Sequence, residues 1–212
     1  MNESSCSGLN TDNSICSKET INTSTSFERD IPISEDKKKS IIKSISKNLK
    51  EIIKENIQNN QMAYVRNDIF YYNHIPGISI DDYINRIFKS TRMNISTLIV
   101  SIIYIDRFCE INRYVLSMNN IHRILLTACL LSIKFNEDKN IKSKYYADVA
   151  GIPFYDLNNL EFYLYVKLKF SLFVDYNIYQ KYFEYFCKYS YEENKGTEDI
   201  NNKNSNKKAN KK

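Results

Sequence analysis

The stretch from Met118 to Phe135 limits the fold most strongly, because apolar residues occupy nearly every side of the helix that it would form. Those residues are Ile121, Ile124, Leu125, Leu126, Ala128, Cys129, Leu130, Leu131 and Ile133. A helix without a polar face is buried on several sides. One charge, Lys134, stands at its end, just before a polar loop. We therefore expect a central helix that is packed inside other helices and carries a lysine to its rim.

The rest of the chain also favours helices. Only 4 Gly and 3 Pro are present, so the sequence has few of the residues that punctuate a many-stranded sheet. Helical spacing of apolar residues predicts five consecutive helices. They lie at about 80–92, 95–109, 118–135, 143–150 and 153–168. No convincing pair of strands interrupts them, which predicts an all-α bundle around a central third helix, with flanking N- and C-terminal helices.

The chain divides into four predicted parts: a disordered N-terminal extension, an amphipathic helix with a connector, the main domain with a C-terminal helix, and a disordered Lys- and Asn-rich tail. In that order, the parts are residues 1–39, 40–76, 77–190 and 191–212. The two tails are too polar to bury enough surface to offset the entropy of ordering. The amphipathic helix, at about 40–58, either packs on the main domain or helps to dock a partner. The C-terminal helix runs from about Tyr176 to Tyr189.

The positive charge of the chain is concentrated at its end. Five of the 30 Lys and Arg lie in residues 203–212, which contain no acidic residue. The remaining 25 Lys and Arg balance the 25 Asp and Glu, so the net charge of +5 comes from the tail. A nearly neutral domain argues against nucleic-acid binding through a basic face.

Residues that could carry catalysis are sparse. The 5 Cys form no CxxC pair, and with only 2 His no zinc site is recognisable. The sequence also has no Gly-rich phosphate loop and no nucleophile–base set. We therefore expect no enzyme activity, no cofactor, no metal and no small-molecule substrate.

The number of cysteines, the length of the apolar stretches and the N-terminal sequence indicate the cellular compartment. An odd number of cysteines without a pairing pattern suits a reducing environment. No apolar stretch reaches the roughly 20 residues that span a bilayer, and the N-terminus has no basic and apolar run for secretion. We therefore expect no membrane contact, and a location in the nucleus, the cytoplasm or both.

Five short motifs occur in order along residues 83–173. They are YINRI at 83–87, YIDRF at 104–108, HRILL at 122–126, SIKF at 132–135 and LNNLE at 157–161. Each motif is weak alone, but together and at this spacing they resemble the cyclin box. HRILL, LNNLE and the run YYADVAG at 145–151 are most similar to the P-type cyclins, which are related to the phosphate-signalling cyclins of yeast. The chain after Phe173 is too short for a second box, so the resemblance is to a single box.

The resemblance implies roles for four charged residues. Lys134 and Glu161 match the pair with which the family contacts its kinase. Arg86 and Asp106 match an arginine and an aspartate that pair between the first two box helices. Each of these two charges lies in an apolar helix, where an unpaired charge is costly to bury, so we expect a structural ion pair.

The function that the resemblance implies is a non-catalytic regulatory subunit that activates a cyclin-dependent protein kinase. In that mechanism the third and fifth box helices pack on the mobile αC helix of the kinase and reorder its activation loop. Two alternatives stay open. Cyclin-like boxes also act in transcription factors that bind nucleic acid, and a box can bind a kinase as a scaffold without activating it.

Overall fold

The computed structural model describes residues 33–64, 68–139 and 142–188 of the 212-residue chain. Its elements are α1 (Glu35–Gln58), the short 3-10 helix η1 (Gln61–Tyr64), α2 (Ile80–Thr91), α3 (Ile95–Asn112), α4 (Ile121–Asn136), α5 (Ser143–Ala150) and α6 (Phe154–Lys167). Residues 176–188 are also helical. No strand occurs within the described ranges, which confirms the predicted all-α fold.

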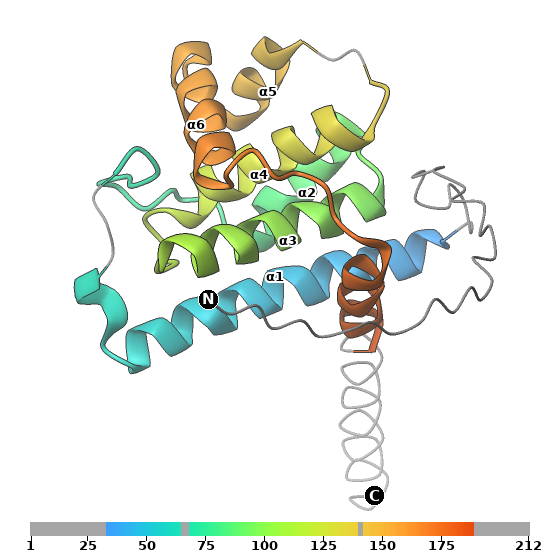
Figure 1. Cartoon of the computed structure of the whole chain (residues 1–212), viewed down its shortest axis with the longest axis horizontal. Helices are drawn as coiled ribbons and strands as arrows, with labels where there is room; N and C mark the ends of the chain where they lie inside the picture. The colour runs from blue at the N-terminus through green and yellow to red at the C-terminus, as the bar shows by residue number, and fades with distance from the viewer. Residues whose placement is uncertain (1–32, 65–67, 140–141, 189–212) are drawn as a thin grey trace, which may run out of the picture.

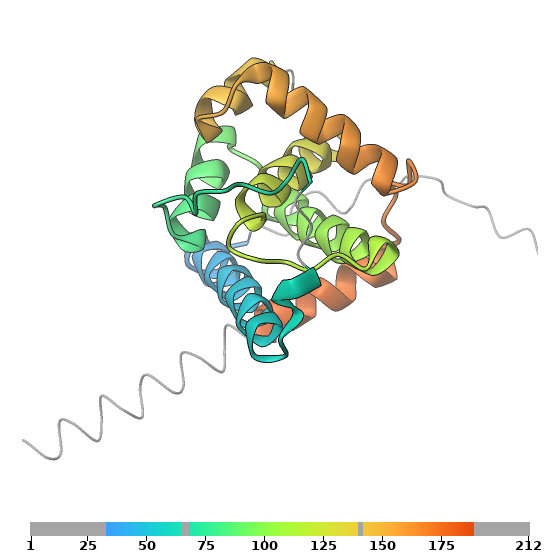
Figure 2. The ribbon, with the colours of Figure 1, turned by 90° about the vertical axis from the view of Figure 1, so that its left-hand side faces the viewer.

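α4 occupies the centre of the bundle, with the other helices arranged around it (Figure 2). Every residue from Ile121 to Ile133 except Arg123 is buried. Its main neighbours are α3 and α6, and α2 also contacts it. The apolar residues on all sides of α4 thus face other helices, as its sequence predicts.

α1 begins earlier than predicted, at Glu35 rather than near residue 40. Ser34 is the N-cap, and its side chain accepts a hydrogen bond from the backbone N–H of Lys37. Glu35 and Asp36 lie in the first turn, where their negative charges interact favourably with the partial positive charge of the helix N-terminus. The helix therefore includes part of the predicted N-terminal extension. Residues 1–32 and 189–212, which contain the rest of the predicted tails, lie outside the described residues.

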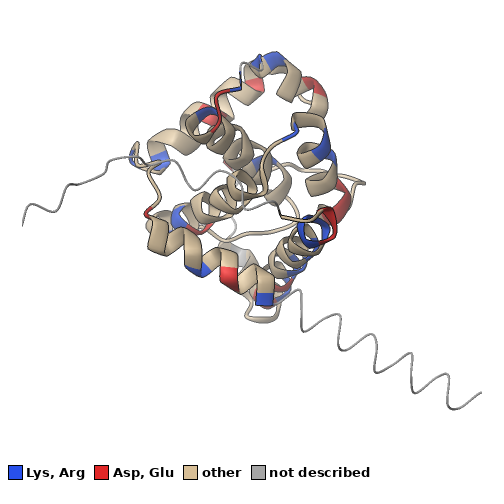
Figure 3. Ribbon diagram, turned by 90° about the vertical axis from the view of Figure 1, so that its right-hand side faces the viewer, with Lys and Arg blue, Asp and Glu red and all other residues tan. Residues whose placement is uncertain are grey.

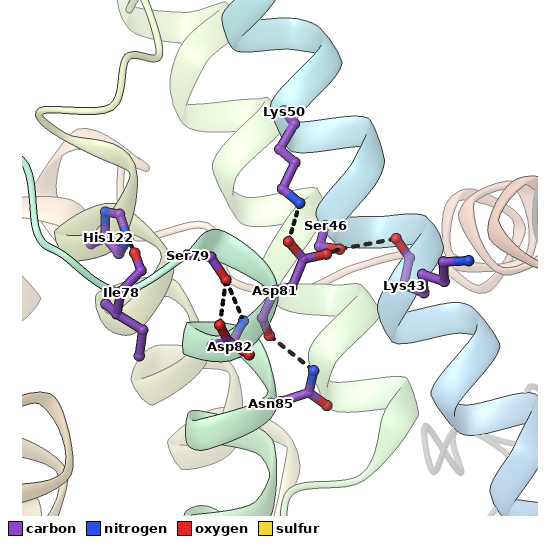
Figure 4. A network of polar contacts seen from close by, with 9 residues as sticks. All are labelled: Lys43, Ser46, Lys50, Ile78, Ser79, Asp81, Asp82, Asn85 and His122. Atoms are coloured by element: carbon purple, nitrogen blue, oxygen red, sulfur yellow. Dashed lines mark hydrogen bonds and ion pairs between the residues drawn. The ribbon is translucent and has the colours of Figure 1, made fainter.

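Two helix boundaries are set by caps at Ser79 and Gly151. Ser79 accepts a hydrogen bond from the Asp82 backbone N–H at 3.1 Å and donates one to the Asp82 carboxylate at 2.7 Å (Figure 4). Gly151 ends α5 with a φ of 72°, a left-handed conformation in which glycine is preferred. The backbone N–H of Ile152 then bonds to the carbonyl of Ala147 at 3.1 Å, which closes the helix.

α1 is fastened to α2 by both apolar and polar contacts. Its buried apolar residues are Ile41, Ile42, Ile45, Leu49 and Ile53. Ser46 donates a hydrogen bond of 2.5 Å to the Asp81 carboxylate, with which Lys50 forms an ion pair (Figure 4). Burial alone would raise the pKa of Asp81, but the hydrogen bonds from Lys50 and Ser46 outweigh it and lower that pKa. The amphipathic helix thus packs on the main domain, which was one of its two expected roles.

The His-Arg pair at the start of α4 holds the connector that leads to α2. Arg123 donates a hydrogen bond to the Ile69 carbonyl at 2.9 Å, and its guanidinium carbon lies 4.9 Å from the centre of the Tyr72 ring. His122 Nε2 lies 3.1 Å from the Ile78 carbonyl, to which the Nε2–H tautomer donates (Figure 4). Both side chains of the HR motif are therefore used within the fold.

The predicted C-terminal helix lies against α1. Figure 1 shows the chain leaving α6, crossing α3 and reaching residues 176–188 beside α1. Phe186 is buried, and the Asn48 side chain donates a hydrogen bond of 3.1 Å to the Tyr185 hydroxyl. The Lys37 ammonium group lies 5.5 Å from the centre of the Phe183 ring. α1 and this helix together close the side of the bundle opposite α6.

Removing side-chain volume from α4 should destabilise the whole fold. Leu130 is fully buried, so Leu130→Ala leaves a cavity and should lower the free energy of unfolding by about 2–5 kcal/mol. Urea denaturation measures this loss. Lys144→Ala, a truncation on the exposed face of α5, should change it by less than about 0.5 kcal/mol. Similar losses in the two variants would contradict a central α4.

His122 should make folding stability depend on pH near neutrality. Burial lowers the pKa of His122, although its contact with the Ile78 carbonyl acts in the opposite direction. Below about pH 6.5, His122 therefore binds a proton more readily in the unfolded chain than in the folded chain. The contribution of His122 to stability is thus complete above that pH and is lost as the pH falls toward the lower pKa of the folded state.

Urea unfolding at about pH 7.5 and about pH 5.5 tests this dependence. The comparison variant is His122→Gln, whose side-chain amide can still donate to the Ile78 carbonyl. The wild type should lose more unfolding free energy between the two pH values than the variant, by at most about 1.4 kcal/mol per pH unit. Equal losses would show that His122 is protonated as readily in the folded chain as in the unfolded chain.

Candidate functional site

Lys134 and Glu161, which the sequence analysis singled out, form an ion pair across two helices. Lys134 lies in the last turn of α4 and Glu161 lies within α6, and the packing of these helices brings them together. The Lys134 ammonium lies 2.6 Å and 2.8 Å from the two carboxylate oxygens of Glu161. The Lys134 side chain is 42% exposed and that of Glu161 is 17% exposed. Such a partly exposed pair adds little to stability but fixes the direction of two charges at the surface.

A surface pocket of about 290 Å³ opens beside this ion pair. Besides Lys134 and Glu161, its lining consists of Leu131, Phe135, Asn158, Phe162, Tyr165 and Leu172. The pocket is therefore mostly apolar, with two opposite charges and one amide at its wall. Its volume is at the small end of ligand sites, and it suits an apolar side chain from a partner.

α6 is apolar on two faces, and only one of them is covered. Its buried face, continued just beyond the helix, consists of Leu157, Leu160, Leu164 and Leu168. Phe162 and Val166 of the same helix are by contrast 68% and 38% exposed. The leucines recur every three or four residues, so they form one stripe, and Phe162 and Val166 form a second stripe on another side of the helix. Of the two stripes, only the first faces the interior.

Other exposed aromatic side chains line this pocket, pack on a lining residue or follow one in the sequence. Phe135 lines it and is 52% exposed. Phe170 is 59% exposed and packs on Tyr165, which lines the pocket, with ring centres 4.9 Å apart. Phe173 is 56% exposed and follows Leu172, another lining residue. We call this set, with Phe162, Val166 and the Lys134–Glu161 ion pair, the α4–α6 surface. Grouped exposed apolar side chains of this kind mark an interaction site.

The end of α4 that carries Lys134 is held in place by Glu137. The Glu137 side chain is only 3% exposed and forms an ion pair with Lys139. Its carboxylate also accepts a hydrogen bond of 2.7 Å from the backbone N–H of Asn94, the N-cap of α3. A carboxylate at a helix N-terminus is favourable. This contact ties the end of α4 to the start of α3, and it was not predicted from the sequence.

The predicted ion pair between Arg86 and Asp106 is absent from the part of the chain that the structure describes. Both side chains are exposed, so the premise that each charge is buried is wrong. α2 buries Tyr83, Ile84 and Ile87, which leaves Arg86 on its other side. Asp106 instead accepts a hydrogen bond from the hydroxyl of Tyr182 in the C-terminal helix.

The described surface shows no other site of a recognisable chemical class. Figure 3 shows Lys and Arg interspersed with Asp and Glu along the helices rather than gathered on one face. No group of three or more His, Cys, Asp or Glu side chains within residues 33–64, 68–139 and 142–188 could hold a metal ion. Among the same residues, every helix is too short or too polar to cross a membrane.

Comparison with known proteins assigns the family. The model of the family described as "Cyclin" matches residues 10–178, which is most of the chain. Cyclin-U2-1 of Arabidopsis thaliana is 35% identical over 129 residues, which are 60% of this chain and 58% of that protein. Cyclin-U2-2 of the same plant is 36% identical over 118 residues, which are 55% of this chain and 51% of the relative.

P-type names also occur among the relatives. Cyclin-P3-1 of Oryza sativa subsp. japonica is 33% identical over 107 residues, 50% of this chain and 45% of that protein. The match therefore covers about half the length of each of these relatives. Relatives with U-type names and relatives with P-type names both match, so the P-type part of the prediction is not confirmed. The all-α fold, the ordered motifs and the family match agree: the chain belongs to the cyclin family.

Proposed function

We propose that this cyclin is the regulatory, non-catalytic subunit of a cyclin-dependent protein kinase, which it binds through the α4–α6 surface. The observation that carries the proposal is the ion pair of Lys134 and Glu161 beside an open apolar pocket. Both residues match the positions at which the family contacts its kinase. The exposed α4–α6 surface is thus where the partner that the family implies would bind.

The α4–α6 surface supplies the two kinds of contact that a specific interface needs. Aromatic side chains such as Phe162 and Phe135 are exposed and can lose their water on docking, which is the main source of affinity. The ion pair adds direction, because a partner with a complementary dipole fits in one orientation only. Because both carboxylate oxygens of Glu161 accept hydrogen bonds from Lys134, this carboxylate is already oriented before the partner arrives.

The proposed consequence of binding is activation of the kinase. The resemblance implies that α4 and α6, the third and fifth helices of the box, pack on the mobile αC helix of the kinase and bring its glutamate to the ATP-binding lysine. This chain would supply no catalytic group of its own. We further propose that it acts in the nucleus, the cytoplasm or both, and that its nearest functional counterparts are the P-type cyclins.

The test is to mix the purified chain with a panel of cyclin-dependent kinases and to measure both binding and phosphorylation of a proline-directed peptide. We expect at least one kinase to bind and to be activated. Replacing both charges, Lys134→Ala with Glu161→Ala, should weaken that binding at least about tenfold, equivalent to about 1.4 kcal/mol. Phe162→Ala should weaken it to a similar degree without lowering the melting temperature, because Phe162 is exposed in the unbound chain.

A matched control is Lys144→Ala with Asp148→Ala, which removes two exposed opposite charges from α5. This control should bind and activate as the wild type does. Binding without activation would support a scaffold in place of an activator. If no kinase binds or is activated, the proposed function is wrong, and if the Lys134 and Glu161 variant binds normally, the assigned surface is wrong.

A further inference from the structure

α6 ends in a turn whose backbone is unusual for its residues. Lys169 and Phe170 have φ values of 53° and 60°, in the left-handed region where glycine is the common residue. The Phe170 N–H bonds to the Tyr165 carbonyl at 3.1 Å, and the Lys169 N–H bonds to the Val166 carbonyl at 2.9 Å. Two successive bulky residues keep this conformation only where the surroundings hold it, and such strain is often found at binding sites.

α3 holds the residues that directly follow this turn. The strap, which we define as residues 169–174, crosses α3 after leaving α6 (Figure 1). Tyr104 donates a hydrogen bond of 2.7 Å to the Leu172 carbonyl. Arg107 donates to the carbonyls on either side, at 2.7 Å to Ser171 and at 3.3 Å to Phe173 from each of two nitrogens. Three successive carbonyls of the strap are thus fixed by side chains of one helix.

The strap carries part of the α4–α6 surface. Leu172 lines the pocket, and the Phe170 ring packs edge-on against Tyr165, which also lines it. The backbone conformation of the strap therefore sets the positions of the Leu172 and Phe170 side chains relative to Lys134 and Glu161. A surface that is already in its binding conformation loses less entropy when a partner docks.

We propose that Arg107 is a positioning residue for kinase binding, which acts by holding the strap against α3; the docking role rests on the function proposed above. Its guanidinium stays protonated and presents several N–H donors in a fixed plane, which suits two carbonyls that lie close together. Tyr104 contributes to the same attachment, but it is fully buried and so belongs to the core. Arg107 is only half-buried, so its contacts with the strap can be removed with the core left intact.

The variant that tests this is Arg107→Met, which keeps an unbranched apolar stem and removes every donor. Kinase binding should weaken about tenfold, while hydrogen exchange of the strap amides accelerates and exchange in α4 stays unchanged. Arg107→Lys keeps the charge and a donor and should recover part of the affinity. Arg86→Met is the matched control, since Arg86 is an exposed arginine with no hydrogen bond or ion pair to the described residues.

A double-mutant cycle that combines Arg107→Met with Phe170→Ala tests whether Arg107 affects kinase binding by positioning Phe170. If Arg107 acts by placing Phe170, Arg107→Met should cost clearly less affinity in the Phe170→Ala background than in the wild type. Fully additive losses would overturn that route, and unchanged binding by Arg107→Met would overturn the inference. Hydrogen exchange on the free chain needs no kinase, so unchanged strap exchange in Arg107→Met also overturns it. Failure of the wild type to bind any kinase overturns instead the proposed function and, with it, the docking role of the strap.

Discussion

α4 has no side that faces water along most of its length, and the arrangement of the other helices follows from that burial. Each neighbouring helix covers part of α4: α3 and α6 pack along it, and α2 contacts it as well. The residues at its start hold the connector, through His122 and Arg123. The residues at its end are held by Glu137 against the start of α3. A helix this fully enclosed places its last turn, and therefore Lys134, at a fixed point on the molecular surface.

α6 turns this buried arrangement into an interaction surface. Its leucine stripe packs inward, and the stripe that contains Phe162 and Val166 is left without a covering helix in the described chain. The strap then brings Leu172 and Phe170 to the same place, because Tyr104 and Arg107 of α3 hold its carbonyls. The apolar pocket and the Lys134–Glu161 ion pair are thus products of the same packing that stabilises the core. A single domain can in this way present a rigid docking surface.

Much of this fold is predictable from the sequence, since it depends on strong local signals. The all-apolar pattern of α4 identifies the central helix, and the apolar periodicity of the other segments identifies the helices around it, which the structure confirms. Features that depend on how the helices pack against one another are harder to predict from the sequence. Arg86 was placed in an apolar stripe by its neighbours in sequence, but the geometry of α2 turns it outward. For α6, composition alone does not say that the leucine stripe is covered and that the stripe with Phe162 is exposed. The strap bonds of Arg107 join residues far apart in the sequence and leave no local pattern.

Hydroxyl-radical footprinting of the chain, alone and in complex with a cyclin-dependent kinase that it activates, measures whether the kinase covers the α4–α6 surface. Oxidation rates of exposed aromatic side chains report whether each is covered in the complex. We expect lower oxidation of Phe135, Phe162 and Phe170 in the complex, since all three belong to the α4–α6 surface. η1 lies away from α6 in both Figure 1 and Figure 2. Its Tyr64, which is 72% exposed, should therefore be oxidised equally in the two samples. Unchanged oxidation at the three phenylalanines, with protection elsewhere, would contradict the α4–α6 surface as the site at which the kinase binds.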